Sequence, residues 1–104
     1  MTAPGLTSSR TIGDVFAQRF GVVSSPEIIR CKLTSNDKFI VMGTDGMFSF
    51  LSNQYCIGKV VNFYNKSDSK GAAKKLFDDS TCMWKNEEDT IDDITCLLIF
   101  ISKI

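Results

Sequence analysis

Histidine is absent from the 104 residues of this sequence. Its absence excludes imidazole metal ligands, imidazole general acids and catalytic triads built on histidine. Any catalysis by these residues would have to use carboxylates, lysines, thiols or metal-bound water. The sequence also lacks any Cys-x-x-Cys pair, because its four cysteines are isolated from one another: Cys31, Cys56, Cys82 and Cys96. We therefore expect reduced thiols in the core, and a disulfide framework is the less favoured alternative.

Net charge, a secretory leader and long apolar runs are missing as well. Twelve basic and twelve acidic residues cancel, which gives no electrostatic reason to expect nucleic acid or an anionic membrane as a partner. The first ten residues are rich in Ser, Thr, Gly and Pro, and no apolar run is long enough to span a bilayer. These absences predict a cytoplasmic or nuclear protein. With 43% hydrophobic and 23% charged residues, we expect one globular unit over residues 1–104.

Three segments have the apolar pattern of strands. Residues 28–33 alternate apolar and basic side chains in their second half, residues 39–44 are apolar on both faces, and residues 94–101 form an unbroken apolar run. The polar residues 34–38 predict a turn that joins the first two strands in a hairpin. Because residues 39–44 are apolar on both faces, we expect them to form a central strand.

Three other segments predict helices. Residues 11–20 carry apolar side chains at near-helical spacing, and Gly21 would close this short helix. Ser52 is a natural N-cap for a helix that runs to residue 64, and a longer helix is expected over residues 69–85. Each of these two helices has an apolar stripe that we expect to be buried: Cys56, Ile57, Val60, Val61 and Tyr64 in the first, and Ala72, Ala73, Leu76, Phe77, Ser80, Met83 and Trp84 in the second.

A single carboxylate follows the strand predicted at residues 39–44. Asp45 comes directly after residues 39–44, and Gly46 lets the backbone turn sharply. Asp92 and Asp93 come just before the strand at residues 94–101. If these strands run antiparallel in one sheet, the carboxylates emerge at the same rim, where Mg²⁺ or Mn²⁺ would relieve their repulsion. From the spacing alone, a metal site and a solvated turn are about equally supported.

Five ordered blocks resemble a known family. They are PGLTSSRTIGD at residues 4–14, PEI at 26–28, FIVMGTDGMFSFLSNQ at 39–54, AAKKL at 72–76 and DDIT at 92–95. In this order they are similar to the later blocks of the metal-dependent type 2C serine/threonine protein phosphatases. Residues 1–104 would then be the C-terminal portion of that catalytic domain, because the family's earlier blocks, with further metal-binding acids and a histidine, have no counterpart here.

The resemblance implies an α+β fold that is part of an α-β-β-α sandwich with antiparallel sheets. It implies two Mg²⁺ or Mn²⁺ ions and hydrolysis of phosphoserine and phosphothreonine in protein substrates by a metal-activated water. Asp45 and Asp92 would be metal ligands, and no other catalytic residue is implied in this chain. Four residues would support the ligands without binding metal: Gly46, Asp93, Asp14 and Arg10.

One departure from the family pattern and one alternative function follow. Ser49 stands where the family usually has an acid for a third metal, which puts that site in doubt. We expect little or no phosphatase activity from the isolated chain, because two or three carboxylates cannot fill two octahedral coordination shells. The alternative is a non-catalytic module, either pseudophosphatase-like or a dimer formed through exposed sheet edges.

Overall fold

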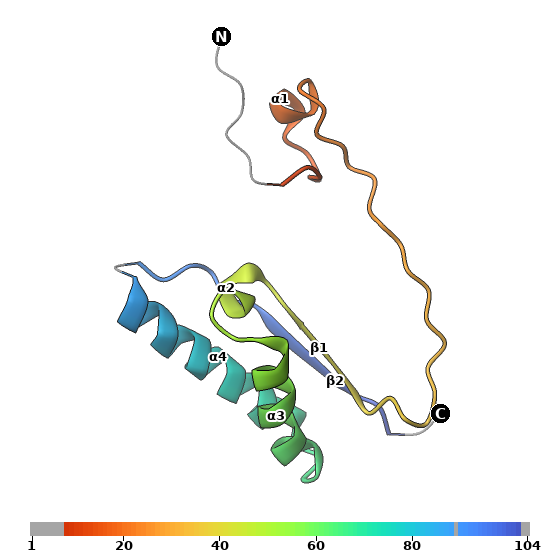
Figure 1. Cartoon of the computed structure of the whole chain (residues 1–104), viewed down its shortest axis with the longest axis vertical. Helices are drawn as coiled ribbons and strands as arrows, with labels where there is room; N and C mark the ends of the chain where they lie inside the picture. The colour runs from red at the N-terminus through yellow and green to blue at the C-terminus, as the bar shows by residue number, and fades with distance from the viewer. Residues whose placement is uncertain (1–7, 89, 103–104) are drawn as a thin grey trace. The chain divides into compact units, whose positions relative to one another are not determined.

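The computed structural model describes residues 8–88 and 90–102, and its contacts divide the chain after Lys32 into two compact units. Figure 1 shows the elements of each unit in chain order. The first unit carries one helix, and the second carries two strands and three helices. The prediction of a single unit over residues 1–104 is not tested by this division and stays a prediction.

The first unit is built around a single helical turn, α1 (Val15–Gln18). Asp14 caps it with a left-handed backbone, at φ 54°, and accepts a hydrogen bond from the N–H of Ala17. The helix ends at Gln18, and the turn that follows reaches Gly21, whose φ of 102° favours glycine. Ala17 is buried, whereas Ile12 is fully exposed. The predicted short helix is therefore confirmed, although it is shorter than residues 11–20 and ends three residues before Gly21.

The strand expected at residues 28–33 is wrong. This segment forms no strand, and all six of its side chains are exposed. Arg30 and Lys32 would share the wet face of such a strand, and within the described residues no other strand pairs with this segment. The turn that follows is confirmed, because the N–H of Asp37 donates to the carbonyl of Thr34 at 3.0 Å. It leads into a strand that finds its partner elsewhere, and the predicted hairpin is absent from the described residues.

The second unit contains an antiparallel pair, β1 (Phe39–Gly43) and β2 (Cys96–Phe100). Phe39 lies opposite Phe100 and Gly43 opposite Cys96. Both strands agree with the sequence-based prediction, and their antiparallel direction meets the condition on which a shared rim was expected. β1 was expected to be central, but within the described residues the sheet has two strands and β2 is the only partner of β1. β1 is not central because residues 28–33, which were expected to pair with its other edge, form no strand.

Three helices complete this unit: α2 (Asp45–Phe48), α3 (Asn53–Tyr64) and α4 (Ser69–Glu87). Ser52 caps α3 through its hydroxyl oxygen, which accepts from the N–H of Tyr55 at 3.1 Å. Asp68 caps α4 in the same way, accepting from Gly71 at 2.9 Å. The two long helices are confirmed, whereas α2 was not predicted. Within the described residues, none of the helices combines the length and the apolar character that crossing a bilayer requires.

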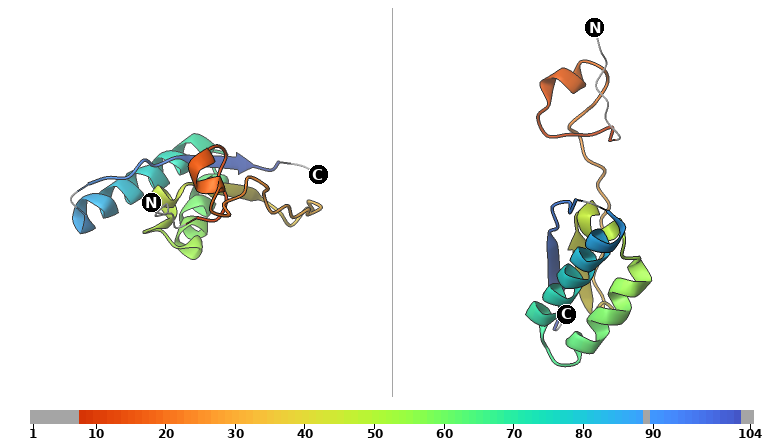
Figure 2. Two further views of the ribbon diagram at one scale, coloured as in Figure 1. Left: turned by 90° about the horizontal axis from the view of Figure 1, so that it is seen from above. Right: turned by 90° about the vertical axis from the view of Figure 1, so that its left-hand side faces the viewer.

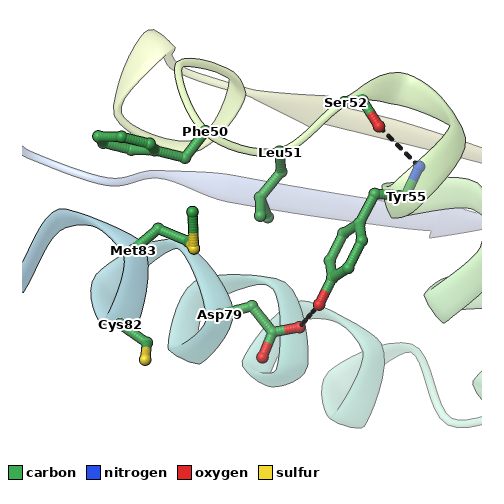
Figure 3. Close-up of a pocket in the computed structure, with 7 residues that line it drawn as sticks. All are labelled: Phe50, Leu51, Ser52, Tyr55, Asp79, Cys82 and Met83. Atoms are coloured by element: carbon green, nitrogen blue, oxygen red, sulfur yellow. Dashed lines mark hydrogen bonds between the residues drawn. The ribbon is translucent and has the colours of Figure 1, made fainter. Parts of the chain in front are cut away.

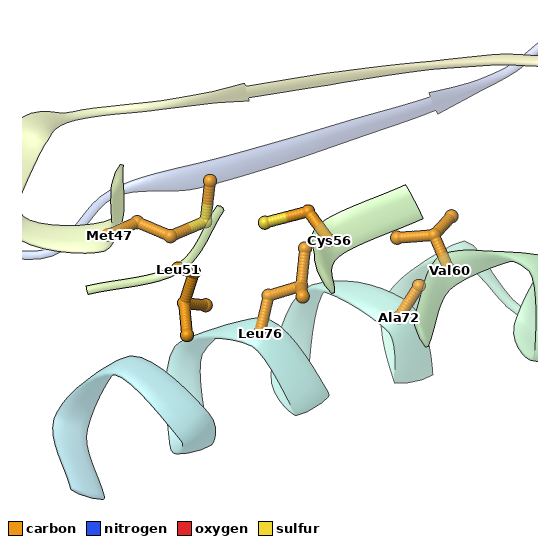
Figure 4. Packing of buried hydrophobic residues seen from close by; sticks show 6 residues of the cluster. All are labelled: Met47, Leu51, Cys56, Val60, Ala72 and Leu76. Carbon is orange, nitrogen blue, oxygen red and sulfur yellow. The ribbon is translucent and has the colours of Figure 1, made fainter. Parts of the chain in front are cut away.

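The two long helices cover one face of the sheet (Figures 1 and 2). Between them and the strands lies the core, whose buried members are shown in Figure 4: Met47, Leu51, Cys56, Val60, Ala72 and Leu76. Alternate strand residues face this cluster, among them Val41 and Leu98. Their neighbours on the other face are exposed: Ile40, Met42, Leu97 and Ile99. This arrangement confirms the α+β class.

Some residues expected in the core are not buried. Ile57, Val61 and Phe77 are 41–47% exposed, because the buried face of each helix is narrower than its apolar stripe. All four thiols are free. Cys56 is buried and Cys96 is half-buried, and burial raises the pKa of both thiols. The core prediction is wrong for Cys31 and Cys82, which are exposed.

Candidate metal centre

Asp45 is the first residue of α2, directly after β1 and its following residue Thr44. Its side chain is exposed. The carboxylate stands in the first turn of a helix, where the helix dipole favours negative charge, although a helix of four residues contributes little of this effect. The position of Asp45 therefore depends on what holds the short helix in place.

Thr44 ties the end of β1 to the segment that carries the other acids. Its N–H donates to the carbonyl of Thr95 at 3.1 Å, and its hydroxyl accepts from the N–H of Thr95 at 3.1 Å. The same hydroxyl donates to the carbonyl of Asp93 at 3.4 Å. These bonds continue the antiparallel pairing by one residue beyond β1. We call the resulting end of the sheet, residues 44–46 and 92–95, the acidic rim.

Gly46 closes the acidic rim. It is buried, and a Cβ at this position would collide with the carbonyl oxygen of Asp93. Its own carbonyl accepts a hydrogen bond from the indole N–H of Trp84 at 2.6 Å. Only a residue without a side chain can let the two backbone segments approach this closely. The structure thus brings the residue after Asp45 against Asp93, as the antiparallel arrangement predicts.

Asp92 and Asp93 are both exposed. One oxygen of Asp92, Oδ1, accepts from the N–H of Asp93 at 2.8 Å. Among the described residues no hydrogen bond to the second carboxylate oxygen, Oδ2, is found, so this oxygen could accept a ligand. Asp92 therefore keeps the oxygen that a metal would need, at the same end of the sheet as Asp45.

The donors of the acidic rim match a hard divalent cation in kind, since they are carboxylate and carbonyl oxygens. They are too few for a complete site. The residues that the structure describes include no group of three or more acids, cysteines or histidines that could hold a metal ion. Mg²⁺ takes about six oxygens in octahedral geometry. The acidic rim fits part of a metal site, with the remaining ligands supplied by water or by other groups.

Arg10 and Asp14 lie in the first unit, and their bonds there are local. Arg10 forms an exposed ion pair with Glu27, with 3.8 Å between Nη2 and Oε1. Asp14 caps α1. These contacts give each residue a structural role within its own unit. Their supporting role toward metal ligands stays a prediction.

Away from the acidic rim, a groove of about 370 Å³ lies between α4 and the start of α3. Figure 3 shows Tyr55 pointing across it, and the phenol donates to Oδ2 of Asp79 at 2.6 Å. This bond is the largest cause that raises the pKa of Tyr55 to about 12. Burial opposes ionisation of Asp79, but hydrogen bonds from Tyr55 and Lys75 outweigh it and hold the pKa of Asp79 below its ordinary value.

Sequence reasoning missed three features of these sites. The helix α2 is too short for periodicity to indicate. Trp84 was assigned to a buried stripe, and its hydrogen bond to Gly46 spans 38 residues, which no local pattern reveals. The Tyr55–Asp79 pair spans 24 residues. The local sequence indicates only the other partner of Asp79, which is Lys75 at i,i+4 spacing.

The fold and the acidic rim first define a class: an α+β unit with acidic residues at one end of an antiparallel pair. Comparison with known proteins then makes the assignment specific. The family model described as "Protein phosphatase 2C" matches residues 3–91. This chain belongs to the protein phosphatase 2C family. The match ends one residue before Asp92, so the assignment of the family does not depend on the second candidate ligand.

Curated relatives extend the similarity over nearly the whole chain. The probable protein phosphatase 2C 35 of Arabidopsis thaliana is 33% identical over 101 residues, which are 97% of this chain and 28% of that protein. The probable protein phosphatase 2C 64 of Oryza sativa subsp. japonica is 35% identical, over 95% of this chain and 23% of its own. The probable protein phosphatase 2C 72 of Arabidopsis thaliana is also 35% identical, over 94% and 30%. No solved structure matches.

The share of each relative that this chain covers limits what the similarity shows about function. The chain spans 23–30% of the first three relatives. The sequence similarity shows the family of the chain, and the activity of a whole protein is a separate question.

Proposed function

We propose that this chain forms part of a metal-dependent protein phosphatase domain that hydrolyses phosphoserine and phosphothreonine in proteins. Membership of the protein phosphatase 2C family supports the reaction class. The observation that supports the site is the close approach of Gly46 to the carbonyl of Asp93, since these residues directly follow the two candidate ligands in the sequence. We further propose a cytoplasmic or nuclear location, with a phosphoprotein as the partner.

In this proposal Asp45 and Asp92 bind Mg²⁺ or Mn²⁺. Such ions, when bound, would lower the pKa of a water so that it forms hydroxide, the nucleophile for phosphorus, near neutral pH, and would neutralise the phosphoryl oxygens. Asp45 would offer its exposed carboxylate, and Asp92 the oxygen that Asp93 leaves unbonded. Thr44 and Gly46 would fix the spacing of these acids through their contacts with residues 93–95.

The test uses two proteins. The isolated chain should show little or no Mn²⁺-dependent hydrolysis of p-nitrophenyl phosphate, because the acidic rim supplies too few ligands. In the second protein, a chimera, this chain replaces the matched segment of the Arabidopsis protein phosphatase 2C 72. We expect this chimera to be active. Within the chimera, Asp45→Asn or Asp92→Asn should lower activity at least about tenfold, a loss that removing a group supporting a metal commonly produces.

Asp78→Asn is the matched control. Asp78 is an exposed carboxylate that pairs with Lys74 on α4, so this change removes the same charge away from the acidic rim. Strong turnover by the isolated chain would contradict the proposal of an incomplete site. A folded chimera without activity would contradict the phosphatase proposal, and one that tolerates Asp45→Asn would contradict the ligand assignment.

A second candidate function, a non-catalytic interaction module, is favoured by one observation. The outer face of the β1–β2 sheet exposes four apolar side chains: Ile40, Met42, Leu97 and Ile99. Apolar residues that adjoin on one exposed face are typical of a binding surface. Under this alternative the chain would bind a partner or a second copy of itself without hydrolysing phosphate.

A further inference from the structure

The short helix α2 cannot be stable through its own bonds. It has four residues, and its N-cap Thr44 makes no side-chain capping bond to it. Forming a first helical turn is unfavourable in isolation, so helices this short depend on tertiary contacts. Asp45 therefore takes its orientation from whatever residues hold α2.

Trp84 of α4 contacts α2 near both of its ends. Its indole N–H donates to the carbonyl of Gly46, in the first turn, at 2.6 Å. Its ring meets the ring of Phe50, two residues beyond the helix, edge to face with centroids 4.8 Å apart. An edge-to-face aromatic pair restricts the tilt of both rings. The indole is thus held in place by Phe50 while it holds Gly46.

The bond to Gly46 is well placed to matter. The carbonyl that accepts it belongs to the residue after Asp45, and the backbone of that residue also lies against Asp93. Tilting α2 away from α4 would lengthen the bond from Trp84 and disturb the contact with Asp93 together. A short, partly buried hydrogen bond of this kind resists such a tilt.

We propose that Trp84 is a positioning residue: its indole N–H fixes the orientation of α2 and, through it, the placement of the Asp45 carboxylate at the acidic rim. The part of this inference that concerns metal rests on the proposed function, whereas the part that concerns the orientation of α2 does not. α4 ends at Glu87, shortly before Asp92 and Asp93 in the sequence. The helix that orients Asp45 is therefore also the element that precedes the other two acids.

The test removes a single N–H group. Trp84 is the only tryptophan in the chain, so biosynthetic replacement of tryptophan by β-(3-benzothienyl)alanine changes this position alone and substitutes sulfur for the indole N–H. Replacement by 4-fluorotryptophan is the matched control, because it keeps the N–H and alters only the ring.

Amide hydrogen exchange of the full chain reports on α2. The amides of Phe48, Ser49 and Leu51 donate to Thr44, Asp45 and Met47 in and after this helix. We expect the benzothienyl protein to exchange these amides about threefold to tenfold faster, the range that one ordinary hydrogen bond supplies, with α3 unchanged. The 4-fluorotryptophan protein should match the unmodified chain. Equal rates in both proteins, or a uniform increase that includes α3, would overturn the proposal.

Mn²⁺-induced broadening of the Asp45 and Asp93 amide signals provides the second readout. We expect the benzothienyl protein to need a several-fold higher Mn²⁺ concentration for half-maximal broadening, and 4-fluorotryptophan to restore the original value. Unchanged Mn²⁺ affinity alongside faster exchange in α2 would overturn the metal-positioning role. If the unmodified chain shows no broadening that depends on Asp45, the metal-positioning role fails for this chain, and the exchange result alone decides whether Trp84 orients α2.

Discussion

Gly46 is the residue whose side chain matters most by being absent. We expect Gly46→Ala to lower the free energy of unfolding by about 1–3 kcal/mol, the usual effect of forcing atoms into a packed site, because the new Cβ would meet the backbone oxygen of Asp93. Urea unfolding measures this change. Neither backbone segment can move aside as a flexible side chain would.

Gly58→Ala is the matched control for this substitution. Gly58 lies inside α3, and a Cβ there would meet nothing within 4 Å. Replacing an unconstrained helical glycine by alanine should stabilise the chain by about 0.5–1 kcal/mol. If both substitutions shifted stability in the same direction, close packing at Gly46 would not be the cause.

The Tyr55–Asp79 pair predicts a dependence of stability on alkaline pH. The pKa of Tyr55 is raised from 10.0 to about 12, so the folded state holds the phenolic proton more tightly than the unfolded state does. The stabilisation is complete below pH 10 and is lost as the pH rises towards 12. We expect the stability advantage of the wild type over Tyr55→Phe to be constant near neutral pH and to narrow across this range.

Urea unfolding at a series of pH values measures that advantage, and the ultraviolet absorbance of tyrosinate checks its cause. Tyr55→Phe should remove the ionisation step near pH 12. At the acidic end, the lowered pKa of Asp79 means that its contribution is lost as the pH falls through its folded-state pKa. A step near pH 12 that persists in Tyr55→Phe would show that this ionisation does not belong to Tyr55.

The helices and strands that were predicted correctly have local sequence signals, such as a capping residue or an apolar stripe. The element that was missed has none. Ser52 is followed by an apolar stripe at helical spacing, so the start of α3 was found at the observed residue. α2 has neither length nor a side-chain cap, and its existence depends on distant contacts. The strand predicted at residues 28–33 failed for the opposite reason. Its alternating pattern is locally suitable for a strand, but within the described residues it has no strand to pair with.

The cap of α3 can be tested directly. Ser52→Ala should destabilise the second unit by about 1 kcal/mol, because it removes the oxygen that accepts from the N–H of Tyr55. Ser52→Asp is the control, since aspartate caps a helix as well as serine does. Thermal or urea unfolding measures both variants. Equal destabilisation by alanine and aspartate would mean that packing at this position, rather than capping, is responsible.

At the scale of the whole molecule, the acidic rim could be predicted because it needs only the antiparallel pairing of two apolar strands. That pairing places Gly43 opposite Cys96. The acids near these two residues in the sequence are therefore brought to the same end of the sheet. The contribution of Trp84 could not be predicted, since it requires the packing of α4 against α2. Spacing alone left the rim undecided between a metal site and a solvated turn. The interpretation as a metal site came from the family resemblance and stays a prediction.

The outer face of the sheet leads to a prediction about assembly. The antiparallel register sets Ile40 opposite Ile99 and Met42 opposite Leu97, so four side chains, each 37–51% exposed, adjoin on one face. Removing this apolar area from water is favourable at about 25 cal/mol per Å². Within the part of the chain that the structure describes, the two-stranded sheet also has unpaired edges. We therefore expect the isolated chain to self-associate as its concentration rises in sedimentation velocity.

Leu97→Lys should shift that equilibrium towards the monomer, because a charge placed in the centre of the contact would have to lose its water on association. Phe77→Lys is the matched control: Phe77 is 45% exposed on α4, a helix that packs on the other face of the sheet, so its replacement should leave association unchanged. A wild-type chain that stays monomeric at all concentrations would contradict the prediction. Equal effects of the two lysines would show that general surface hydrophobicity, rather than this face, drives association.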